Sequence, residues 1–162
     1  MNENSLDIFD NAKKNRILLK NLDDTQDLAL EIKSLIVRPV VIALYGDLGT
    51  GKTEFARFLM RSLGIKGDIA SPTFTILQVY DLQATLSLDI EAVYHFDLYR
   101  IETRAELEEI GWYEALRSNY IVIAEWPELA EETLPLNTIR LLFELDAEGQ
   151  RFCSIVGQHI GI

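Results

Sequence analysis

Hydrophobic and polar positions form two kinds of pattern along this chain, and together they predict an α/β fold. Short apolar runs of the kind that form strands occur at residues 16–22, 40–45, 76–80, 93–97, 119–125, 139–145 and 151–156. Between the first two runs, Leu28, Ile32, Leu35 and Ile36 recur at helical spacing, which predicts a helix with one apolar face. Strands and helices alternate early while hairpins crowd the end. We therefore expect a parallel core sheet flanked by antiparallel strands, with helices on both faces.

Polar residues with capping oxygens predict where two helices begin. Asp23, Asp24 and Thr25 offer N-cap oxygens to the first helix. Thr103 is expected to cap a later helix that extends to Tyr113, with its apolar side chains turned inward and its acidic side chains in solvent. Residues 81–91, between two predicted strands, are expected to form a hairpin excursion with no chemistry of its own.

Length and composition indicate one globular domain. At 162 residues the chain is long enough for one full core, and nearly half of its residues are hydrophobic. Residues 1–15 are mostly polar and are predicted to be a loosely ordered N-terminal arm, which leaves residues 16–162 as the folded domain. No apolar run approaches the roughly 20 residues of a membrane helix, and the N-terminus is too polar for a signal peptide. The single cysteine, Cys153, cannot form an internal disulfide, so a cytoplasmic location is expected.

The strongest chemical signal is the sequence Gly46-Asp47-Leu48-Gly49-Thr50-Gly51-Lys52-Thr53, which follows an apolar strand and precedes a helical stretch. This is the pattern of a P-loop in its required context, so the sheet is expected to be a P-loop NTPase-like sandwich. Glycines allow the backbone to approach phosphate oxygens, and successive N–H groups at the helix N-terminus form an anion site. We expect phosphates to be bound by Leu48, Gly49, Thr50, Gly51, Lys52 and Thr53.

Two of these residues have individual roles in that prediction. Lys52 would reach the outer phosphates, and the Thr53 hydroxyl would hold Mg²⁺. The expected ligands are therefore a nucleotide and Mg²⁺, and the family resemblance described below implies that the nucleotide is ATP. The formal net charge of −11 weighs against tight direct binding of nucleic acid, which requires clustered Lys and Arg.

Hydrolysis of a bound nucleotide needs a carboxylate on the metal side and a group that places water. Asp97 and Glu125 each end an apolar strand, where open α/β sheets hold their ligands. Either could hold Mg²⁺ while the other polarises the attacking water. Ser71 and Thr73, on either side of Pro72, could form a switch loop that senses the γ-phosphate. His95, one of two histidines, is interpreted as a hydrogen-bonded core or wall residue rather than a catalytic base.

Four motifs together resemble one family. The P-loop, Ser71-Pro72-Thr73-Phe74-Thr75, His95-Phe96-Asp97-Leu98-Tyr99-Arg100 and Glu125-Trp126-Pro127 have the order and spacing of TsaE, the small bacterial ATPase of tRNA threonylcarbamoyladenosine (t6A) biosynthesis. The resemblance runs from about Leu22 to Arg151. It implies slow, Mg²⁺-dependent ATP hydrolysis coupled to the threonylcarbamoyl transferase subunit and its partner subunit.

The resemblance also implies roles for particular residues. Thr53 and Glu125 would ligate Mg²⁺, and Asp97 would lie beside the phosphates. Ser71 and Thr73 would form the switch-like loop, and Trp126 would matter for activity, although from its sequence context alone it is interpreted as a packing residue. Adenine contacts would fall near Leu22 and Thr25 and on the last hairpin, where Gln150 occupies the place expected for arginine.

Three other functions are alternatives to an ATPase. A small-molecule P-loop kinase needs an arginine-bearing lid to shield the transferred group, and the region after Trp126 is acidic instead. A GTPase is rejected because its D-x-x-G match at residues 146–149 falls in a late hairpin turn with no guanine-reading motif after it. A module that binds ATP without turnover remains open.

Overall fold

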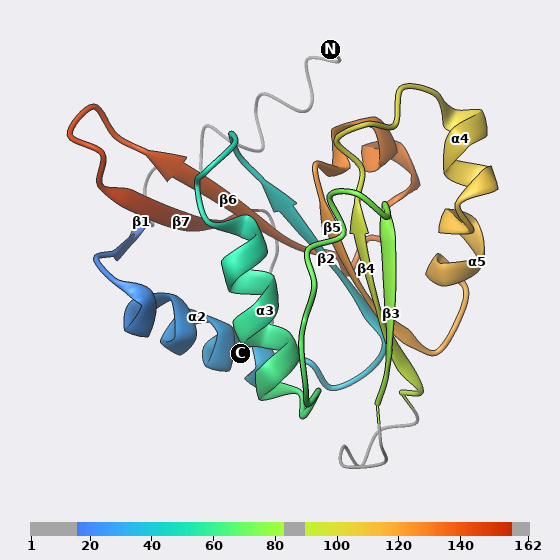
Figure 1. The fold of residues 1–162 in the computed structure, drawn as a ribbon, viewed down its shortest axis with the longest axis horizontal. Helices are drawn as coiled ribbons and strands as arrows, with labels where there is room; N and C mark the ends of the chain where they lie inside the picture. Colours follow the sequence, from blue (N-terminus) through green and yellow to red (C-terminus); the bar gives the residue numbers. More distant parts are fainter. Residues whose placement is uncertain (1–15, 83–89, 157–162) are drawn as a thin grey trace.

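The computed structural model of this protein describes residues 16–82 and 90–156. Along the chain its elements are β1 (Arg16–Leu19), α2 (Leu22–Ser34), β2 (Val40–Tyr45), α3 (Lys52–Ser62), β3 (Leu77–Asp81), β4 (Ala92–Asp97), α4 (Arg104–Glu109), α5 (Trp112–Leu116), β5 (Tyr120–Glu125), the 3₁₀ helix η2 (Pro127–Thr133), β6 (Ile139–Leu145) and β7 (Arg151–Val156). Figure 1 shows them arranged around one twisted sheet.

Within the described residues the sheet has seven strands in the order β1-β7-β6-β2-β5-β4-β3. β6, β2, β5 and β4 run parallel to one another, whereas β7 and β1 on one side and β3 on the other are antiparallel additions. This confirms the predicted parallel core with antiparallel flanks. β2, the strand that leads into the P-loop, lies between β5 and β6 and is almost fully buried, which explains its continuous apolar sequence.

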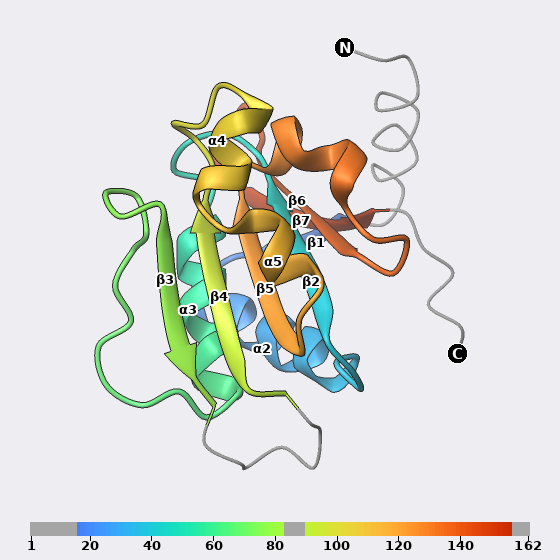
Figure 2. The ribbon, with the colours of Figure 1, turned by 90° about the vertical axis from the view of Figure 1, so that its right-hand side faces the viewer.

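Helices cover both faces of the sheet, as predicted. Figure 2 shows α2 and α3 on one side of the strands and α4, α5 and η2 on the other. On the first side, Phe55 and Leu59 of α3 pack with Phe143 and Cys153 of the last two strands in one continuous buried cluster. On the second side, Trp112 of α5 meets the edge of Phe96, with ring centroids 5.2 Å apart, inside a separate cluster. Each face of the sheet therefore has its own apolar core.

The structure corrects the predicted start of the first helix. β1 ends at Leu19, so Leu22 is the first residue of α2 and not the last of a strand. The N-cap is Asn21, whose side chain accepts a hydrogen bond of 2.9 Å from the Asp24 backbone N–H. Asp24 instead accepts from the backbone N–H of Lys20 at 2.7 Å. The amide oxygen of Asn21 thus performs the capping that the sequence pattern assigned to residues 23–25.

The helix predicted after Thr103 is divided in two. Thr103 does cap α4 through a bond from the Glu106 N–H, but Gly111 adopts a φ of +76° and starts α5 in a new direction. The predicted strand 76–80 begins one residue later, because Ile76 has a φ of +66°. The acidic stretch after Trp126 is the 3₁₀ helix η2.

Two expectations lie wholly or partly outside the described residues. The N-terminal arm over 1–15 cannot be compared with the structure, and neither can most of the excursion over 81–91, of which 83–89 are not described. The single domain over 16–162 stays a prediction. Among the helices of residues 16–82 and 90–156, none is both long and apolar enough to cross a membrane.

Candidate functional site

The candidate site lies at the carboxyl edge of the parallel core, where three neighbouring strands end at or directly before predicted site residues. β2 ends directly before Gly46, β4 ends at Asp97 and β5 ends at Glu125. In the β4–β5 register Asp97 is paired with Glu125, and in the β2–β5 register Glu125 is paired with Leu44. The topology therefore brings the two predicted carboxylates and the P-loop together, at the edge where such sheets hold ligands.

Gly46 is required by the shape of the P-loop. Its φ is +126°, and a Cβ at this position would lie 2.1 Å from the carbonyl oxygen of Phe143 on β6. Only glycine fits so close to a neighbouring backbone. Gly51, with a φ of +103°, precedes the first residue of α3 and turns the chain so that the free N–H groups of this helix face the loop.

Side chains of the P-loop stabilise its curvature from within. The buried Thr50 hydroxyl donates a hydrogen bond of 2.8 Å to the Asp47 carbonyl. Lys52 Nζ donates to the carbonyls of Gly46 and Asp47 at 2.5 and 2.8 Å. A phosphate oxygen is a stronger acceptor for an ammonium group than a carbonyl, so these lysine bonds can be exchanged for ligand bonds.

The Lys52 ammonium is buried beneath an aromatic ring. Its Nζ lies 4.0 Å from the centroid of the Trp126 ring, and Tyr99 packs on the same indole at 4.9 Å. Burial lowers the pKa of Lys52, an effect that the nearby carboxylates Glu125 and Glu128 partly oppose. Trp126 itself has a φ of +55°, a strained value for a residue with a side chain. It therefore contacts the candidate site through Lys52, and packing is only part of its role.

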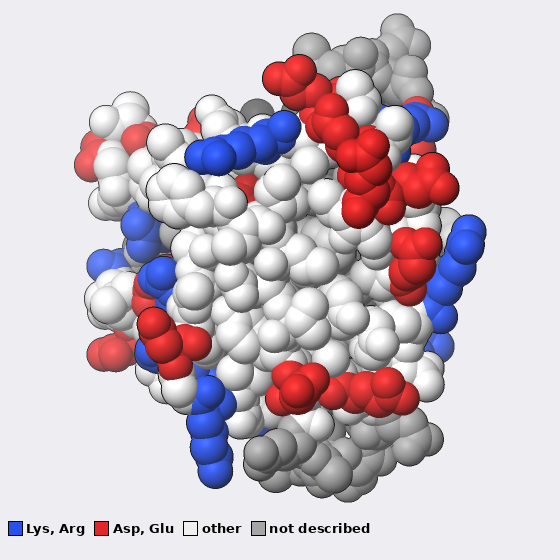
Figure 3. Space-filling view, turned by 45° about the vertical axis from the view of Figure 1, so that its right-hand side comes forward, with Lys and Arg blue, Asp and Glu red and all other residues white. Residues whose placement is uncertain are grey.

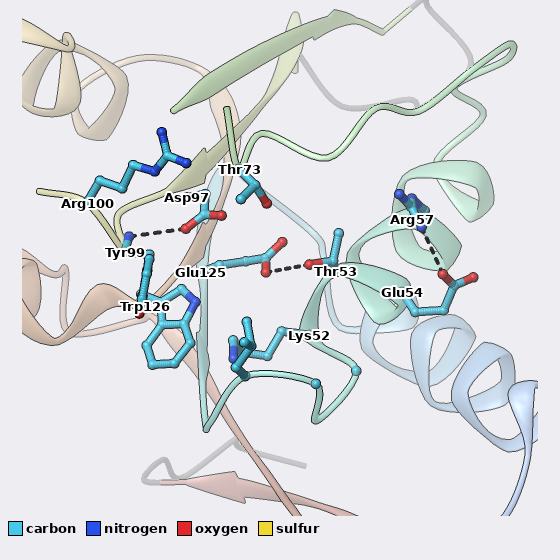
Figure 4. A pocket seen from close by; sticks show the side chains of 13 residues that line it. Lys52, Thr53, Glu54, Arg57, Thr73, Asp97, Tyr99, Arg100, Glu125 and Trp126 are labelled. Carbon is cyan, nitrogen blue, oxygen red and sulfur yellow. Dashed lines mark hydrogen bonds and ion pairs between the residues drawn. The ribbon is translucent and has the colours of Figure 1, made fainter. Parts of the chain in front are cut away.

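Glu125 links the P-loop helix to the core of the sheet. One carboxylate oxygen, Oε2, accepts a hydrogen bond of 2.7 Å from the Thr53 hydroxyl, and the other, Oε1, lies 2.8 Å from His95 Nε2. Glu125 and His95 are both buried. Figure 4 shows Glu125 pointing across the cavity toward Thr53. His95 is thus a hydrogen-bonded core residue, as its position in the strand predicts.

Asp97 ends β4 and lies beside Glu125 at the end of β5. Its Oδ1 accepts a hydrogen bond of 3.1 Å from the Tyr99 backbone N–H, and only 6% of the residue is exposed. Its backbone N–H donates to the carbonyl of Ile76 at 2.8 Å. Asp97 is therefore connected to the segment that carries the predicted switch loop.

That segment is a tight turn over residues 72–75. The Pro72 carbonyl accepts bonds from the N–H groups of Thr75 and Ile76, and the Ser71 and Thr73 hydroxyls lie 2.7 Å apart. The positive φ of Ile76 is unfavourable for a β-branched residue, so the turn ends in a strained position. Of the two hydroxyl residues, Thr73 lines the cavity beside the P-loop.

These residues surround a cavity of about 340 Å³. Figure 4 shows it between the P-loop, the turn that carries Thr73 and the ends of β4 and β5. Two residues that line it are largely exposed, Leu48 by 82% and Tyr99 by 61%. Phe74, which follows Thr73 and lies beneath the Arg100 guanidinium, is exposed by 83%. The cavity is lined by Leu48, Gly49, Gly51, Lys52, Thr53, Glu54, Arg57, Thr73, Asp97, Tyr99, Arg100, Glu125 and Trp126.

A second cavity, of about 450 Å³, lies beside the last hairpin. Gln150, predicted to contact adenine, is in its wall together with Gly149, Arg151 and residues 18–20. The other two predicted adenine contacts do not line it. Leu22 is exposed at the start of α2, and the buried Thr25 hydroxyl donates to the Asn21 carbonyl at 3.3 Å.

Arg151 is a candidate site residue that sequence reasoning missed. A Cβ placed on Gly51 would lie 3.1 Å from Arg151 Nε, so this side chain packs directly against the P-loop. Its Nε is buried and has no hydrogen-bond partner in the described part of the chain. Strand alternation could have indicated the face, because Arg151 lies two residues before the buried Cys153. The hairpin of β6 and β7 is predicted by the sequence, but the pairing of β6 with β2, which brings Arg151 near the loop, is not indicated by any local pattern.

The donor atoms fit Mg²⁺ in the manner of a P-loop. Thr53 and Glu125 supply a hydroxyl and a carboxylate oxygen in contact, and Asp97 adds a second carboxylate to the same cavity. In residues 16–82 and 90–156 no group of three His, Cys, Asp or Glu side chains could hold a metal alone. Mg²⁺ in such proteins is held by one or two side-chain oxygens and completed by phosphates and water, so a full protein cage is not required.

Comparison with known proteins gives a consistent result. Residues 19–153 match the family model described as threonylcarbamoyl adenosine biosynthesis protein TsaE. The tRNA threonylcarbamoyladenosine biosynthesis protein TsaE of Rickettsia felis is 36% identical over 141 residues, which cover 86% of this chain and 78% of that protein. The protein of the same name from Bacillus subtilis is 33% identical over 132 residues, or 81% and 78% of the two chains. The crystal structure of Bacillus subtilis YdiB has a TM-score of 0.68 and 25% identity, and the match covers 88% of this chain and 84% of that one.

Proposed function

This chain belongs to the TsaE family, and we propose that it binds and hydrolyses ATP with Mg²⁺ in support of tRNA threonylcarbamoyladenosine formation. The observation that carries the proposal is the convergence of Lys52, Thr53 and Glu125 at the N-terminus of α3. A cation, a hydroxyl and a carboxylate meet there at a backbone loop shaped for anions.

ATP binding would begin with the triphosphate on the P-loop. The N–H groups of residues 48–53 surround the phosphates, while Lys52 exchanges its two carbonyl acceptors for β- and γ-phosphate oxygens. The Trp126 ring above Nζ keeps water away from this ammonium, which strengthens its attraction for the phosphates. Arg151 and Gln150, beyond Gly51, extend the site toward the second cavity, where the nucleoside would lie.

Hydrolysis would transfer the γ-phosphoryl group to water and release ADP and phosphate. Mg²⁺, which Thr53 and Glu125 would hold with Asp97 beside it, would supply charge neutralisation on the phosphate oxygens. The carboxylate that does not hold the metal, which is Asp97 in this arrangement, would orient the attacking water. Thr73 reaches the same cavity from the switch turn, so the γ-phosphate would also bias the conformation of that turn.

We propose the threonylcarbamoyl transferase subunit and its partner subunit as the macromolecular partners, in the cytoplasm. Leu48 and Tyr99 in the lining of the cavity, and Phe74 against the lining residue Arg100, support this proposal, because large exposed apolar side chains near one cavity mark a surface that another protein covers. A protein docked there would exclude water from the cavity. It would thereby raise the rate of ATP hydrolysis above the slow rate expected of the chain alone.

The test is phosphate release from Mg²⁺–ATP, measured with and without the transferase complex. Slow release that increases when the complex is added supports the proposal. Tight ATP binding with no release under either condition would indicate an ATP-binding module without turnover. Transfer of phosphate to a small molecule instead of water would indicate the kinase alternative, although the chain has no arginine-bearing lid after Trp126.

A further inference from the structure

His95 is completely buried at the centre of β4, directly behind the candidate site. Asp97 pairs with Glu125 in the register of β4 and β5, so His95 stands two residues earlier on the same face of the sheet. From that position its Nε2 reaches Glu125 Oε1 at 2.8 Å. The opposite oxygen of the same carboxylate accepts the Thr53 hydroxyl at 2.7 Å. The three side chains form a continuous row from the interior of the sheet to the P-loop.

We propose that His95 is a positioning residue that fixes the Glu125 carboxylate in the orientation required to hold Mg²⁺ beside Thr53. The inference deepens the proposed function and rests on it, since the metal belongs to the nucleotide complex. His95 itself touches neither nucleotide nor metal. It acts through Glu125 alone.

The hydrogen-bond partners of the imidazole support this role. A carboxylate only accepts, so the ring proton on Nε2 is the one that Glu125 Oε1 binds. The other ring nitrogen, Nδ1, is buried and has no partner in the described part of the chain. A buried polar atom without a partner costs free energy, and an apolar side chain of similar size would fill the space without that cost. What the imidazole adds over such a side chain is its contact with Glu125.

The partners of the carboxylate lead to the same conclusion. Within the described residues, Oε1 of Glu125 has no hydrogen bond other than the one from His95. Without it a buried oxygen would be left unsatisfied, and the carboxylate would rotate to find another donor. With both oxygens bonded, Oε2 is directed at Thr53 before any metal arrives. Groups of this kind behind a metal ligand commonly change metal affinity by about 10- to 100-fold when removed.

The experiment compares His95→Leu, which removes the donor, with His95→Gln, whose side-chain amide nitrogen can take the place of Nε2. Mn²⁺ serves as the probe, and its affinity for the protein–ATP complex is measured by the electron paramagnetic resonance of the free ion. In His95→Leu the dissociation constant for Mn²⁺ should rise by about 10-fold or more, and His95→Gln should recover most of the loss. ATP affinity in EDTA should be unchanged in both, because no metal is present to be positioned.

A double-mutant cycle with Glu125→Ala then distinguishes positioning from a general structural effect. If His95 acts through Glu125, His95→Leu has no further effect on Mn²⁺ affinity in the Glu125→Ala background. Effects that add, or a loss of ATP affinity in EDTA, overturn the inference. If wild type binds Mn²⁺–ATP and His95→Leu binds it equally well, the inference fails while the proposed function stands. If wild type binds no Mn²⁺–ATP, both fail.

A measurement on the wild type keeps the inference testable even if the substituted proteins do not fold. ¹⁵N NMR of the histidine ring reports which nitrogen carries the proton. The inference requires the proton on Nε2 of His95, with a change in that signal when Mg²⁺ is added to the ATP complex. The inference is overturned if the proton is on Nδ1, or if the ¹⁵N signal of His95 does not change when Mg²⁺ is added.

Discussion

The Thr53 hydroxyl donates a hydrogen bond of 2.7 Å to Glu125, 72 residues further along the chain. This bond joins the first turn of α3 to the end of β5 and sets the distance between the two oxygens proposed to share one metal. Any substitution at either residue therefore alters both the proposed metal site and the contact between α3 and β5.

Replacing Glu125 by alanine should separate turnover from nucleotide binding. We expect Glu125→Ala to lower ATP hydrolysis by about 10² or more while ATP is retained, since the carboxylate acts on metal and water and not on the base or sugar. Phosphate release and calorimetric ATP titration measure the two properties. Asp97→Ala, in the same assays, identifies which carboxylate dominates. The matched control is Glu108→Ala on the exposed side of α4, which should behave as wild type. Unchanged hydrolysis in Glu125→Ala would transfer the role to Asp97.

Replacing Lys52 by alanine should abolish function by removing the cation that faces the β- and γ-phosphates. The same change removes two hydrogen bonds to loop carbonyls, so a loss of unfolding free energy of about 1–2 kcal/mol is expected, with the fold intact. Calorimetric titration with ATP checks the affinity, and circular dichroism checks the fold. Lys66→Ala, at an exposed lysine, is the control for loss of one positive charge. If Lys52→Ala bound ATP as tightly as wild type, the P-loop assignment would be wrong.

The P-loop glycines should differ in their tolerance of a side chain. Gly46→Ala places a Cβ against the Phe143 carbonyl and should reduce the free energy of unfolding by about 3 kcal/mol or more. Gly49 also has a positive φ, +80°, but a Cβ there would meet no atom of the described residues within 4 Å, so Gly49→Ala should cost about 1 kcal/mol. Urea denaturation of both variants gives the comparison. Equal losses would mean that backbone conformation alone, and not the approach of β6, demands glycine at Gly46.

Arg151 should contribute to nucleotide affinity although it lies on the last strand. Its guanidinium packs on Gly51, and its Nε has no hydrogen-bond partner among the described residues, so a phosphate or ribose oxygen would satisfy it. We expect Arg151→Ala to weaken ATP binding by about 10-fold, equivalent to about 1.4 kcal/mol. Arg117→Ala, at an exposed arginine after α5, removes the same charge away from the site and should leave the dissociation constant unchanged. Equal ATP affinities in Arg151→Ala and wild type would remove Arg151 from the site.

The protein alone should not bind tRNA, despite the pathway proposed for it. Its net charge is −11, and on the face in Figure 3 the Lys and Arg side chains are scattered while acidic side chains cluster. Phosphate contacts provide most non-specific affinity, so binding should be weaker than about 10⁻⁴ M at physiological salt. Fluorescence anisotropy with labelled tRNA, with and without Mg²⁺–ATP, measures this. Micromolar affinity would contradict the prediction and reveal a basic surface built from separated residues.

The sequence predicted the parts of the fold in which local pattern and final environment agree. The apolar run 40–45 is a buried central strand because it is covered on both faces, and the glycines after it bend as the motif requires. Asp97 and Glu125 meet because the ends of neighbouring parallel strands fall on one edge. Their common location followed from strand ends alone, without knowledge of the strand order.

Two of the features that sequence reasoning missed depend on contacts between distant segments. Arg151 reaches Gly51 only because β7 pairs with β6 and β6 with β2. The contact of His95 with Glu125 depends on the register of β4 and β5, and a one-residue shift would turn it to the other face. At residues 21–25 the error was local, because several neighbouring side chains could cap a helix and their backbone angles decide which one does.

The pairing of β2 with β6 affects how the protein can fold while it is being synthesised on the ribosome. The P-loop strand is complete early in synthesis, but the backbone that borders Gly46 belongs to Phe143, near the other end of the chain. Until residues 139–145 emerge, β2 has an open edge of unpaired N–H and C=O groups beside a wholly apolar sequence. A truncated product that lacks residues 139–145 is therefore expected to carry the entire P-loop motif without the neighbouring strand that borders Gly46.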